Sequence, residues 1–491
     1  MKRFLIAPAV LVLAAGLSAS EPIAFGDVFL DKAMRFDLYF VGDAGNEMIT
    51  IDRIYQEGAW PETRTRLIEP FANGRYAVKV YEIASNRLIY SRGFDTMFGE
   101  YRTTAPALAG VKRVYGRSVR IPWPRRPVRF VIESRDKANI LHALFSEAVD
   151  PSDYHILRES TAGGAFVYEA LKNGSSASHV DLAFVAEGYA PGDRDKFKSD
   201  VDRFVGWLFA VEPYASSKAA FNVTGIMRPS PEPAMDEPRQ GVYKKTLLGA
   251  SFNAFDLDRY MLIEDGHRLR EIAAEVPYDA IVVLVNSRRY GGGGIYGDYC
   301  VTTVDHEASR AVFVHEFGHS FAGLADEYYA SDVSYNDFYP KGVEPLEPNI
   351  TALLDPANVK WKDLLAPGIA VPTEYGKDRF DALQVEAGKV RRDSGREIEE
   401  ARKKGSDAAA VKALEEKGKR AAGDVEAKFQ ALRAEYAAVY DRVGVFEGAG
   451  YASKGLYRPS VECLMITNAK MEFCPVCRRA IRRMIDYFSA E

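Results

Sequence analysis

Two histidines four residues apart, His315 and His319, constrain the fold of this chain more than any other feature. The segments on either side, Ala311 to Val314 and Ser320 to Ala322, permit one helix through the whole stretch. On a helix, positions i and i+4 lie on one face, so the two imidazoles can bind one zinc ion. The alternative is a helix with two exposed histidines. The apolar flanks and a total of only seven histidines argue against it.

Glu316 lies beside the first histidine and can reach a water molecule on that metal. Because zinc lowers the pKa of bound water toward neutrality, a carboxylate placed here can accept its proton. A catalytic zinc also needs a third protein ligand and an open fourth position. Gly323 can end the helix in a left-handed conformation and turn the chain back, bringing Asp326 beneath the metal. We therefore predict Asp326 as the third ligand, with its neighbour Glu327 as the alternative.

The N-terminus has the three-part layout of a secretory signal peptide. Lys2 and Arg3 precede an apolar run from Phe4 to Leu17, and the small residues Ser18 to Ser20 follow. The run is shorter than the roughly 20 residues needed to span a bilayer, which argues against a membrane anchor. We expect a signal peptide over residues 1–20 and an exported protein, periplasmic or extracellular, without a membrane span in the mature chain. The net charge of -5 argues against a nucleic-acid partner.

The cysteines cluster near the C-terminus. In an exported protein such a cluster favours a disulfide staple, and four cysteines allow three complete pairings. The spacing of Cys474 and Cys477 also fits half a zinc knuckle or a redox pair. We predict a structural staple and leave its pairing open. The four cysteines are Cys300, Cys463, Cys474 and Cys477.

Two patterns divide the chain. In residues 21–147, strand-like runs are separated by turn residues, and in residues 128–133 the apolar Val128, Phe130 and Ile132 recur at every second position, the period of a half-buried strand. We interpret this part as an antiparallel β-sandwich. From residue 148 onward, strands and helices alternate, and the run Val180–Ala186, which is apolar apart from Asp181, is typical of an inner strand. Further strands are expected at Phe221–Met227 and Ala280–Val285.

Residues 378–436 form a third pattern, rich in Ala, Glu, Lys and Arg and broken by Gly405. This composition predicts a helical hairpin that projects from the domain, with solvated faces and no catalytic role.

Four consecutive glycines, Gly291 to Gly294, lie upstream of the histidines and allow close approach of the backbone. A phosphate-binding loop is one interpretation of them, but no Gly-Lys-Ser/Thr sequence completes that motif.

The stretch from His315 to Tyr328 resembles the active-site segment of the igalysins, the IgA-peptidase family of bacterial metallopeptidases, which is grouped with the metzincins. Gly323 lies four residues after His319 rather than the three of the common metzincin signature, similar to the igalysin variant. The segment Arg458 to Met465 resembles the methionine turn beneath a metzincin metal, where a thioether forms a soft apolar floor. The alternative is that Met465 is simply a core residue.

The resemblance covers most of residues 150–491. It implies a multidomain α+β and α/β protein, in which a β-sandwich precedes a metzincin-like domain over residues 148–491 that carries the hairpin insertion. It also implies an endopeptidase with one catalytic zinc and a protein or peptide substrate, without specifying IgA. An extended substrate would pair with an edge strand, for which Gly291 to Thr303 is the candidate, with a plain loop as the alternative. Tyr457 is a candidate for oxyanion stabilisation by analogy.

Three alternatives remain at this stage. A gluzincin-like enzyme would use a more distant glutamate, Glu344 or Glu347, as the third ligand. A non-enzymatic secreted binding protein would hold a purely structural zinc, with a fourth protein ligand and no metal-bound water. A phosphate- or nucleotide-binding protein would use the glycine run.

Overall fold

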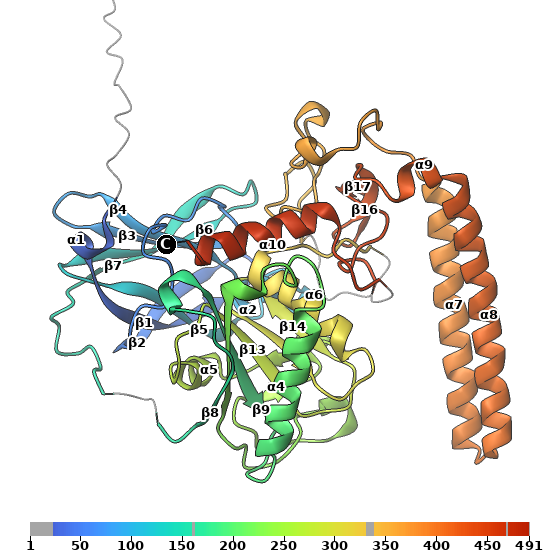
Figure 1. The fold of residues 1–491 in the computed structure, drawn as a ribbon, viewed down its shortest axis with the longest axis horizontal. Helices are drawn as coiled ribbons and strands as arrows, with labels where there is room; N and C mark the ends of the chain where they lie inside the picture. Colours follow the sequence, from blue (N-terminus) through green and yellow to red (C-terminus); the bar gives the residue numbers. More distant parts are fainter. Residues whose placement is uncertain (1–22, 160–162, 330–337, 468–469, 491) are drawn as a thin grey trace, which may run out of the picture.

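The computed structural model describes residues 23–159, 163–329, 338–467 and 470–490. The predicted signal peptide, residues 1–20, lies outside them. The chain has a mixed α/β architecture: a β-rich N-terminal domain, a C-terminal domain around a mixed sheet, and a pair of long helices beside it (Figure 1). In the part of the chain described, no helix is both long and apolar enough to cross a membrane.

Two antiparallel sheets build the N-terminal domain, so this part is rich in strands as predicted. Its strands are β1 (Phe29–Gly42), β2 (Glu47–Gln56), β3 (Tyr76–Glu82), β4 (Leu88–Phe94), β5 (Arg113–Pro124), β6 (Val128–Arg135) and β7 (Leu141–Val149). They pair in the orders β2-β1-β5 and β4-β3-β6-β7. Both sheets contribute to one buried apolar core, where the Phe36 and Phe130 rings stack 4.0 Å apart. The two sheets therefore form a sandwich.

A six-stranded sheet in the order β14-β15-β13-β9-β10-β8 forms the centre of the C-terminal domain. Its strands are β8 (Phe166–Leu171), β9 (Val180–Glu187), β10 (Phe221–Met227), β13 (Ala280–Val285), β14 (Gly292–Ile295) and β15 (Tyr299–Thr303). The four inner strands are parallel, while β14 and β8 run antiparallel at the two edges. The three strands predicted in this domain, β9, β10 and β13, are confirmed.

Helices cover both faces of this sheet because successive side chains of a strand point to opposite faces. The helices are α4 (Arg194–Leu208), α5 (Gly266–Ala273), α6 (Ser309–Ala322) and α10 (Pro475–Phe488). Leu182 and Phe184 of β9 pack in one core with α4, α6 and α10, whereas Ala183 and Val185 pack with α5 on the other face. Helix α6, which carries the two histidines, is thus part of the apolar core shared with α4 and α10.

A buried charge network joins the two domains. Asp298, in the turn between β14 and β15, lies 3.1 Å from Arg117 of the sandwich and 2.5 Å from Arg270 of α5. Arg117 and Arg270 are buried, and the Asp298 side chain is only 10% exposed. Removing one partner of such a network leaves an uncompensated buried charge, so these contacts fix the sandwich against the edge of the sheet that carries β14.

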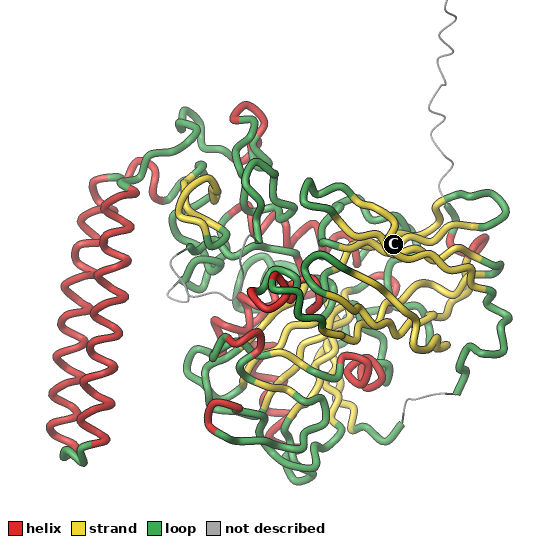
Figure 2. Tube along the Cα trace, turned by 180° about the vertical axis from the view of Figure 1, so that it is seen from behind, coloured by secondary structure: helices red, strands yellow, loops and turns green. Residues whose placement is uncertain are grey.

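The long helices form an antiparallel hairpin that stands beside the C-terminal domain and joins it at one end (Figures 1 and 2). They are α7 (Lys377–Lys403) and α8 (Ala408–Glu435). Exposed ion pairs cross between them, such as Lys417 with Glu397 at 2.7 Å. Near the joined end, Phe380 and Leu432 are buried in a small apolar cluster.

The shorter elements are α1 (Phe25–Val28), α2 (Met97–Tyr101), α3 (Ala105–Leu108), α9 (Ala437–Tyr440), β11 (Ala250–Ser251), β12 (Leu262–Ile263), β16 (Phe446–Ala449) and β17 (Ala452–Arg458).

Candidate functional site

Helix α6 ends at the glycine that the sequence singles out. Gly323 takes the left-handed conformation, with a φ of 60°. Its amide donates to the His319 carbonyl at 2.9 Å, and the Leu324 amide donates to the Gly318 carbonyl at 3.3 Å. These two bonds cap the helix and reverse the chain, as predicted.

The reversal brings three predicted ligand atoms together. His315 Nε2 and His319 Nε2 lie 3.0 Å apart. Asp326 Oδ1 lies 3.0 Å from the first nitrogen and 3.3 Å from the second. The side chains are 11%, 16% and 7% exposed, so little water screens their charges from one another.

Each histidine ring is oriented by a backbone carbonyl. His315 Nδ1 lies 3.0 Å from the Leu464 oxygen, and His319 Nδ1 lies 2.6 Å from the Leu324 oxygen. A carbonyl can only accept a hydrogen bond, so both Nδ1 atoms carry the hydrogen and both neutral rings turn the lone pair of Nε2 toward the partner ring. Metal-binding histidines are oriented in this way.

The three atoms fit a tetrahedral zinc ion. Nitrogen and oxygen ligands at about 2.0–2.1 Å from such an ion stand roughly 3.3 Å from one another. Tyr451 donates its hydroxyl hydrogen to Asp326 Oδ2 at 2.6 Å, which leaves Oδ1 facing the histidines. Oδ1 makes no hydrogen bond of regular geometry with any described residue. Two lone pairs and a carboxylate oxygen this close repel one another unless a cation or a proton lies between them.

Without an ion, a proton takes that place. Burial alone would lower the pKa of His319, but the negative charge of the nearby Asp326 carboxylate outweighs it and raises this pKa to about 9. Burial alone would raise the pKa of Asp326, but the two histidines hold it well below its ordinary value. Asp326 is therefore an ionised carboxylate at neutral pH, the form in which it can bind a metal.

Glu316 lies beside this cluster in a cavity of about 130 Å³. Its carboxylate, His315 and His319 each offer a ligand atom within 4.8 Å of the others. Burial raises the pKa of Glu316, while the nearby histidines and Arg259 act in the opposite direction. A carboxyl group with a raised pKa next to an open metal position is suited to exchange a proton with bound water.

Three of the four glycines, Gly292 to Gly294, lie in strand β14 rather than in a loop. A Cβ atom at Gly294 would come within 2.3 Å of the Glu316 carbonyl oxygen, and one at Gly292 within 2.5 Å of Val312. Glycine is needed here because the edge strand lies directly on α6, beside the general-base candidate. Close packing of β14 on α6 therefore explains why glycines occur here, and the phosphate-loop interpretation is no longer needed to explain them.

The floor of the cluster is apolar. Met465 is fully buried, and a Cβ atom at Gly318 would lie 3.2 Å from its sulfur. The carbonyl of the preceding residue, Leu464, is the one that orients His315. The chain around Met465 therefore supports α6 from below while it fixes one ligand ring.

Comparison with protein families matches this architecture. The family model described as IgA Peptidase M64 matches residues 169–485, well over half of the chain, and that of the Peptidase M64 N-terminus matches residues 24–146. The chain belongs to the M64 peptidase family. This is a family of metallopeptidases, and the resemblance to the igalysins is confirmed. A comparison with curated proteins finds no match.

In this M64 peptidase, the other carboxylates considered as a third metal ligand make contacts with other residues. Glu327 points away from the histidines, and its Oε1 accepts a hydrogen bond from Asn349 at 2.9 Å. Glu344 pairs with Lys360 at 3.2 Å. Glu347 lines the cavity, but its Oε1 accepts from Tyr339. The carboxylate that lies beside both histidine nitrogens is that of Asp326.

The suggested role of Tyr457 does not agree with the structure. Tyr457 lies in β17, where its backbone pairs with Thr351, and it is not among the residues that line the cavity. The tyrosines that do line it include Tyr328 and Tyr451. Arg259 and Tyr451 reach the cavity from turns that no motif marks, whereas Tyr328 ends the stretch that resembles the igalysin segment; none of the three was predicted as a site residue.

The predicted disulfide staple is also wrong for this structure. All four cysteines are buried and free. The sulfurs of Cys463 and Cys477 lie 3.9 Å apart, whereas a disulfide requires about 2.05 Å. Cys300 lies apart from the other three, beside the Phe313 carbonyl of α6. The clustering near the C-terminus therefore has another explanation than covalent pairing.

Proposed function

We propose that this M64 peptidase is an exported zinc endopeptidase of the metzincin type, with Glu316 as its general base. One observation carries the proposal: ligand atoms of His315, His319 and Asp326 meet at the wall of a cavity that also holds Glu316. Three protein ligands with an open side are typical of catalytic zinc, whereas structural zinc has four. The methionine beneath the histidine helix supports the metzincin type.

The proposed reaction uses these residues in separate roles. His315, His319 and Asp326 hold the zinc ion, which supplies a Lewis acid for the attacking water and the peptide carbonyl. Glu316 accepts the proton of the attacking water on its carboxylate and delivers it to the leaving amine. Its raised pKa suits both steps, because the carboxylate is a stronger base than an exposed one and its protonated form still gives up the proton.

The substrate is proposed to lie along β14. This strand is the last one in the sheet order and rests on α6 next to Glu316, and on its outer side Gly292 makes an isolated bridge with Tyr260. Main-chain hydrogen bonds to such an edge would hold an extended peptide beside the proposed metal site, and pockets for its alternate side chains would provide specificity.

A larger groove of about 1170 Å³ connects the site with the helical hairpin. Its wall includes Glu316 and His315 at one end and Arg391 of α7 and Arg433 of α8 at the other. The hairpin therefore borders the approach to the site and is not only a solvated projection. We propose that it contacts the substrate beyond the cleaved bond.

Export is proposed from the N-terminal pattern of residues 1–20. The charged start, the apolar run and the small residues that follow support removal of this segment. We expect the mature chain to begin close to residue 21, which N-terminal sequencing of the secreted or periplasmic protein measures directly.

The decisive experiment for the function is a peptide-library cleavage screen with the wild type and Glu316→Gln, together with zinc analysis of both. The variant keeps the metal ligands and removes the proton acceptor. We expect equal zinc content and a fall in kcat/KM of about 10²- to 10⁴-fold. Unchanged cleavage by the zinc-loaded variant would refute the role of Glu316, and a zinc-loaded wild type that cleaves no peptide would favour the non-enzymatic alternative.

A further inference from the structure

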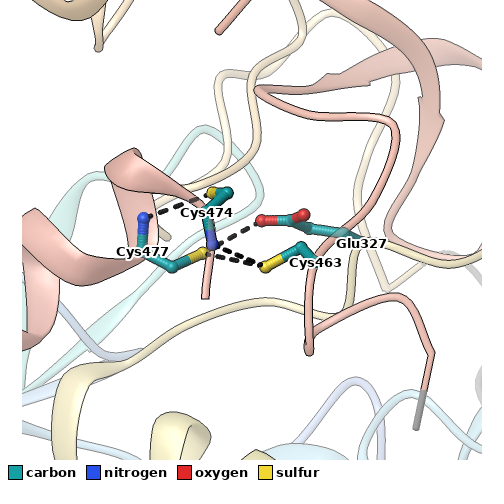
Figure 3. A group of neighbouring side chains, drawn as sticks. All are labelled: Glu327, Cys463, Cys474 and Cys477. Carbon is teal, nitrogen blue, oxygen red and sulfur yellow. Dashed lines mark hydrogen bonds between the residues drawn. The ribbon is translucent and has the colours of Figure 1, made fainter. Parts of the chain in front are cut away.

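A second group of possible metal ligands lies deeper than the catalytic candidates. Cys463, Cys474, Cys477 and Glu327 form the cysteine–glutamate cluster, in which all four side chains are buried and their ligand atoms lie within 4.8 Å of one another (Figure 3). Cys477 Sγ lies 3.9 Å from Cys463 Sγ and 3.1 Å from Glu327 Oε1. Nothing in the peptidase chemistry above uses this cluster.

The backbone around the cluster favours the ionised form of two of the thiols, those of Cys463 and Cys474. Cys474 is the N-cap of the 14-residue helix α10, and its sulfur accepts from the Cys477 amide at 3.5 Å. The Cys474 amide in turn points at Cys463 Sγ, 3.3 Å away. Amide hydrogens and the positive end of a helix dipole stabilise a thiolate, which is the form that binds metals.

One carboxylate oxygen of Glu327 lacks a hydrogen-bond partner among the described residues. The Glu327 side chain is fully buried, Oε1 is bonded to Asn349 and Cys477, and Oε2 has no hydrogen-bond partner among the described residues. A buried carboxylate oxygen without a partner costs free energy unless a cation lies beside it. The Glu327 carboxylate and the three sulfurs are close enough together for one ion to bind all four residues and to balance the buried charge.

We propose that the cysteine–glutamate cluster holds a second zinc ion in a closed, structural site. Four protein ligands with no open position are the pattern of structural zinc. Sulfur atoms about 2.3 Å from a tetrahedral zinc stand roughly 3.8 Å apart, close to the 3.9 Å between Cys463 and Cys477. A disulfide between any two of the cysteines would leave the third and the buried glutamate uncompensated. Binding of the ion releases the thiol protons to solvent.

This second ion would hold the floor of the catalytic centre. Glu327 follows the catalytic ligand Asp326, and its amide donates to the Met465 carbonyl at 2.9 Å. Cys463 precedes Leu464, whose carbonyl orients His315. The ion therefore ties the segments on both sides of the catalytic centre to the start of α10. Its loss should loosen two of the three catalytic ligands.

Metal analysis of the purified full-length protein tests the proposal independently of peptidase activity. We expect two zinc ions per chain in the wild type and one in a variant carrying both His315→Ala and His319→Ala. X-ray absorption of that variant should show zinc bound by three sulfur atoms at about 2.3 Å. One zinc in the wild type and none in the histidine variant would overturn the proposal, as would a disulfide among the three cysteines found by mass spectrometry.

A cysteine variant gives the complementary measurement. Cys474→Ser combined with Cys477→Ser should lose the sulfur-bound zinc, and Cys300→Ser is the matched control because Cys300 is an equally buried thiol outside the cluster. We expect the control to keep two zinc ions. If the double variant does not fold, the sulfur signal of the histidine variant still decides. Retention of two zinc ions by a folded double variant would contradict the site.

Discussion

Asp326 and Glu327 are neighbours in the sequence and belong to two different ligand clusters. Asp326 completes a cluster of three ligand atoms at the wall of an open cavity. Glu327 completes one of four ligand atoms that is closed on all sides by the core. The difference between the clusters is whether water and substrate can reach the metal. A metal can activate water only where a coordination position is free, so only the open cluster is suited to catalysis.

The two carboxylates diverge because the chain between them is held like a strand. The Asp326 carbonyl accepts from the Gly450 amide, whereas the Glu327 amide donates to the Met465 carbonyl. The Tyr328 carbonyl again accepts from the β16–β17 side, from the Tyr451 amide. Neighbouring side chains of an extended segment point to opposite sides. One short segment can therefore supply a ligand to each cluster.

Asp326→Ala should give the largest effect that separates the clusters. The substitution removes a direct ligand of the open cluster. Loss of a residue that only supports a ligand weakens metal binding by up to about 100-fold, so we expect zinc affinity at the open cluster to fall by more than that. Peptide cleavage should fall to background. The sulfur-bound zinc should remain. Metal analysis and a peptide cleavage assay measure both.

Glu327→Gln is the matched control for that variant. It keeps the shape of the side chain and its contact with Asn349 but lowers the charge at the closed cluster. We expect the histidine-bound zinc to remain while the sulfur-bound zinc becomes easier to remove. If Glu327→Gln loses the histidine-bound zinc and Asp326→Ala keeps it, the two carboxylates have been assigned to the wrong clusters.

The open cluster could be predicted from the sequence because its parts are local. The histidine spacing, the end of α6 at Gly323 and the return to Asp326 all fall within residues 315–326, where helix geometry relates sequence distance to position in space. The closed cluster could not be predicted in this way. Cys477 lies 150 residues from Glu327 in the chain, and only the packed fold brings them together.

The same distinction holds for the fold. Alternation of apolar side chains predicted the sandwich, and the charged composition predicted the long helices, because each pattern reflects a local surface. The groove beside the hairpin and the buried charges at Asp298 depend on how separate parts dock, for which a sequence pattern gives no signal. The disulfide prediction failed for a related reason: cysteine spacing does not report whether a carboxylate lies nearby.

Chelation should distinguish the clusters in the wild type. The open cluster lines a cavity, whereas the ligands of the closed one are inaccessible. We expect a chelator to remove about one zinc per chain together with the activity, and added zinc to restore both. The second zinc should leave only as the protein unfolds. Loss of both ions at the same rate from folded protein would contradict the difference in access.

Tyr451→Phe should have an intermediate effect, confined to the open cluster. It removes the hydroxyl that bonds Asp326 Oδ2 at 2.6 Å and keeps the ring. Supporting contacts of this kind contribute about 10- to 100-fold to metal affinity, so zinc should bind more weakly by about that factor, measured by competition with a chelator. Tyr339→Phe is the control, because that hydroxyl bonds Glu347 instead. Equal losses in both variants would point to general loosening of the cavity.

Met465→Leu should have the smallest effect and concern both clusters at once. The side chain lies against α6 at Gly318, and its backbone carbonyl accepts from Glu327, so the residue joins the two sites. Leucine conserves most of the volume, and such exchanges cost less than about 1.5 kcal/mol of unfolding free energy. Both zinc ions should remain, because the backbone contacts do not depend on the thioether. A loss of the histidine-bound zinc alone would show that the sulfur itself supports the open cluster, whereas a loss of both ions would show that the two clusters depend on one packed floor.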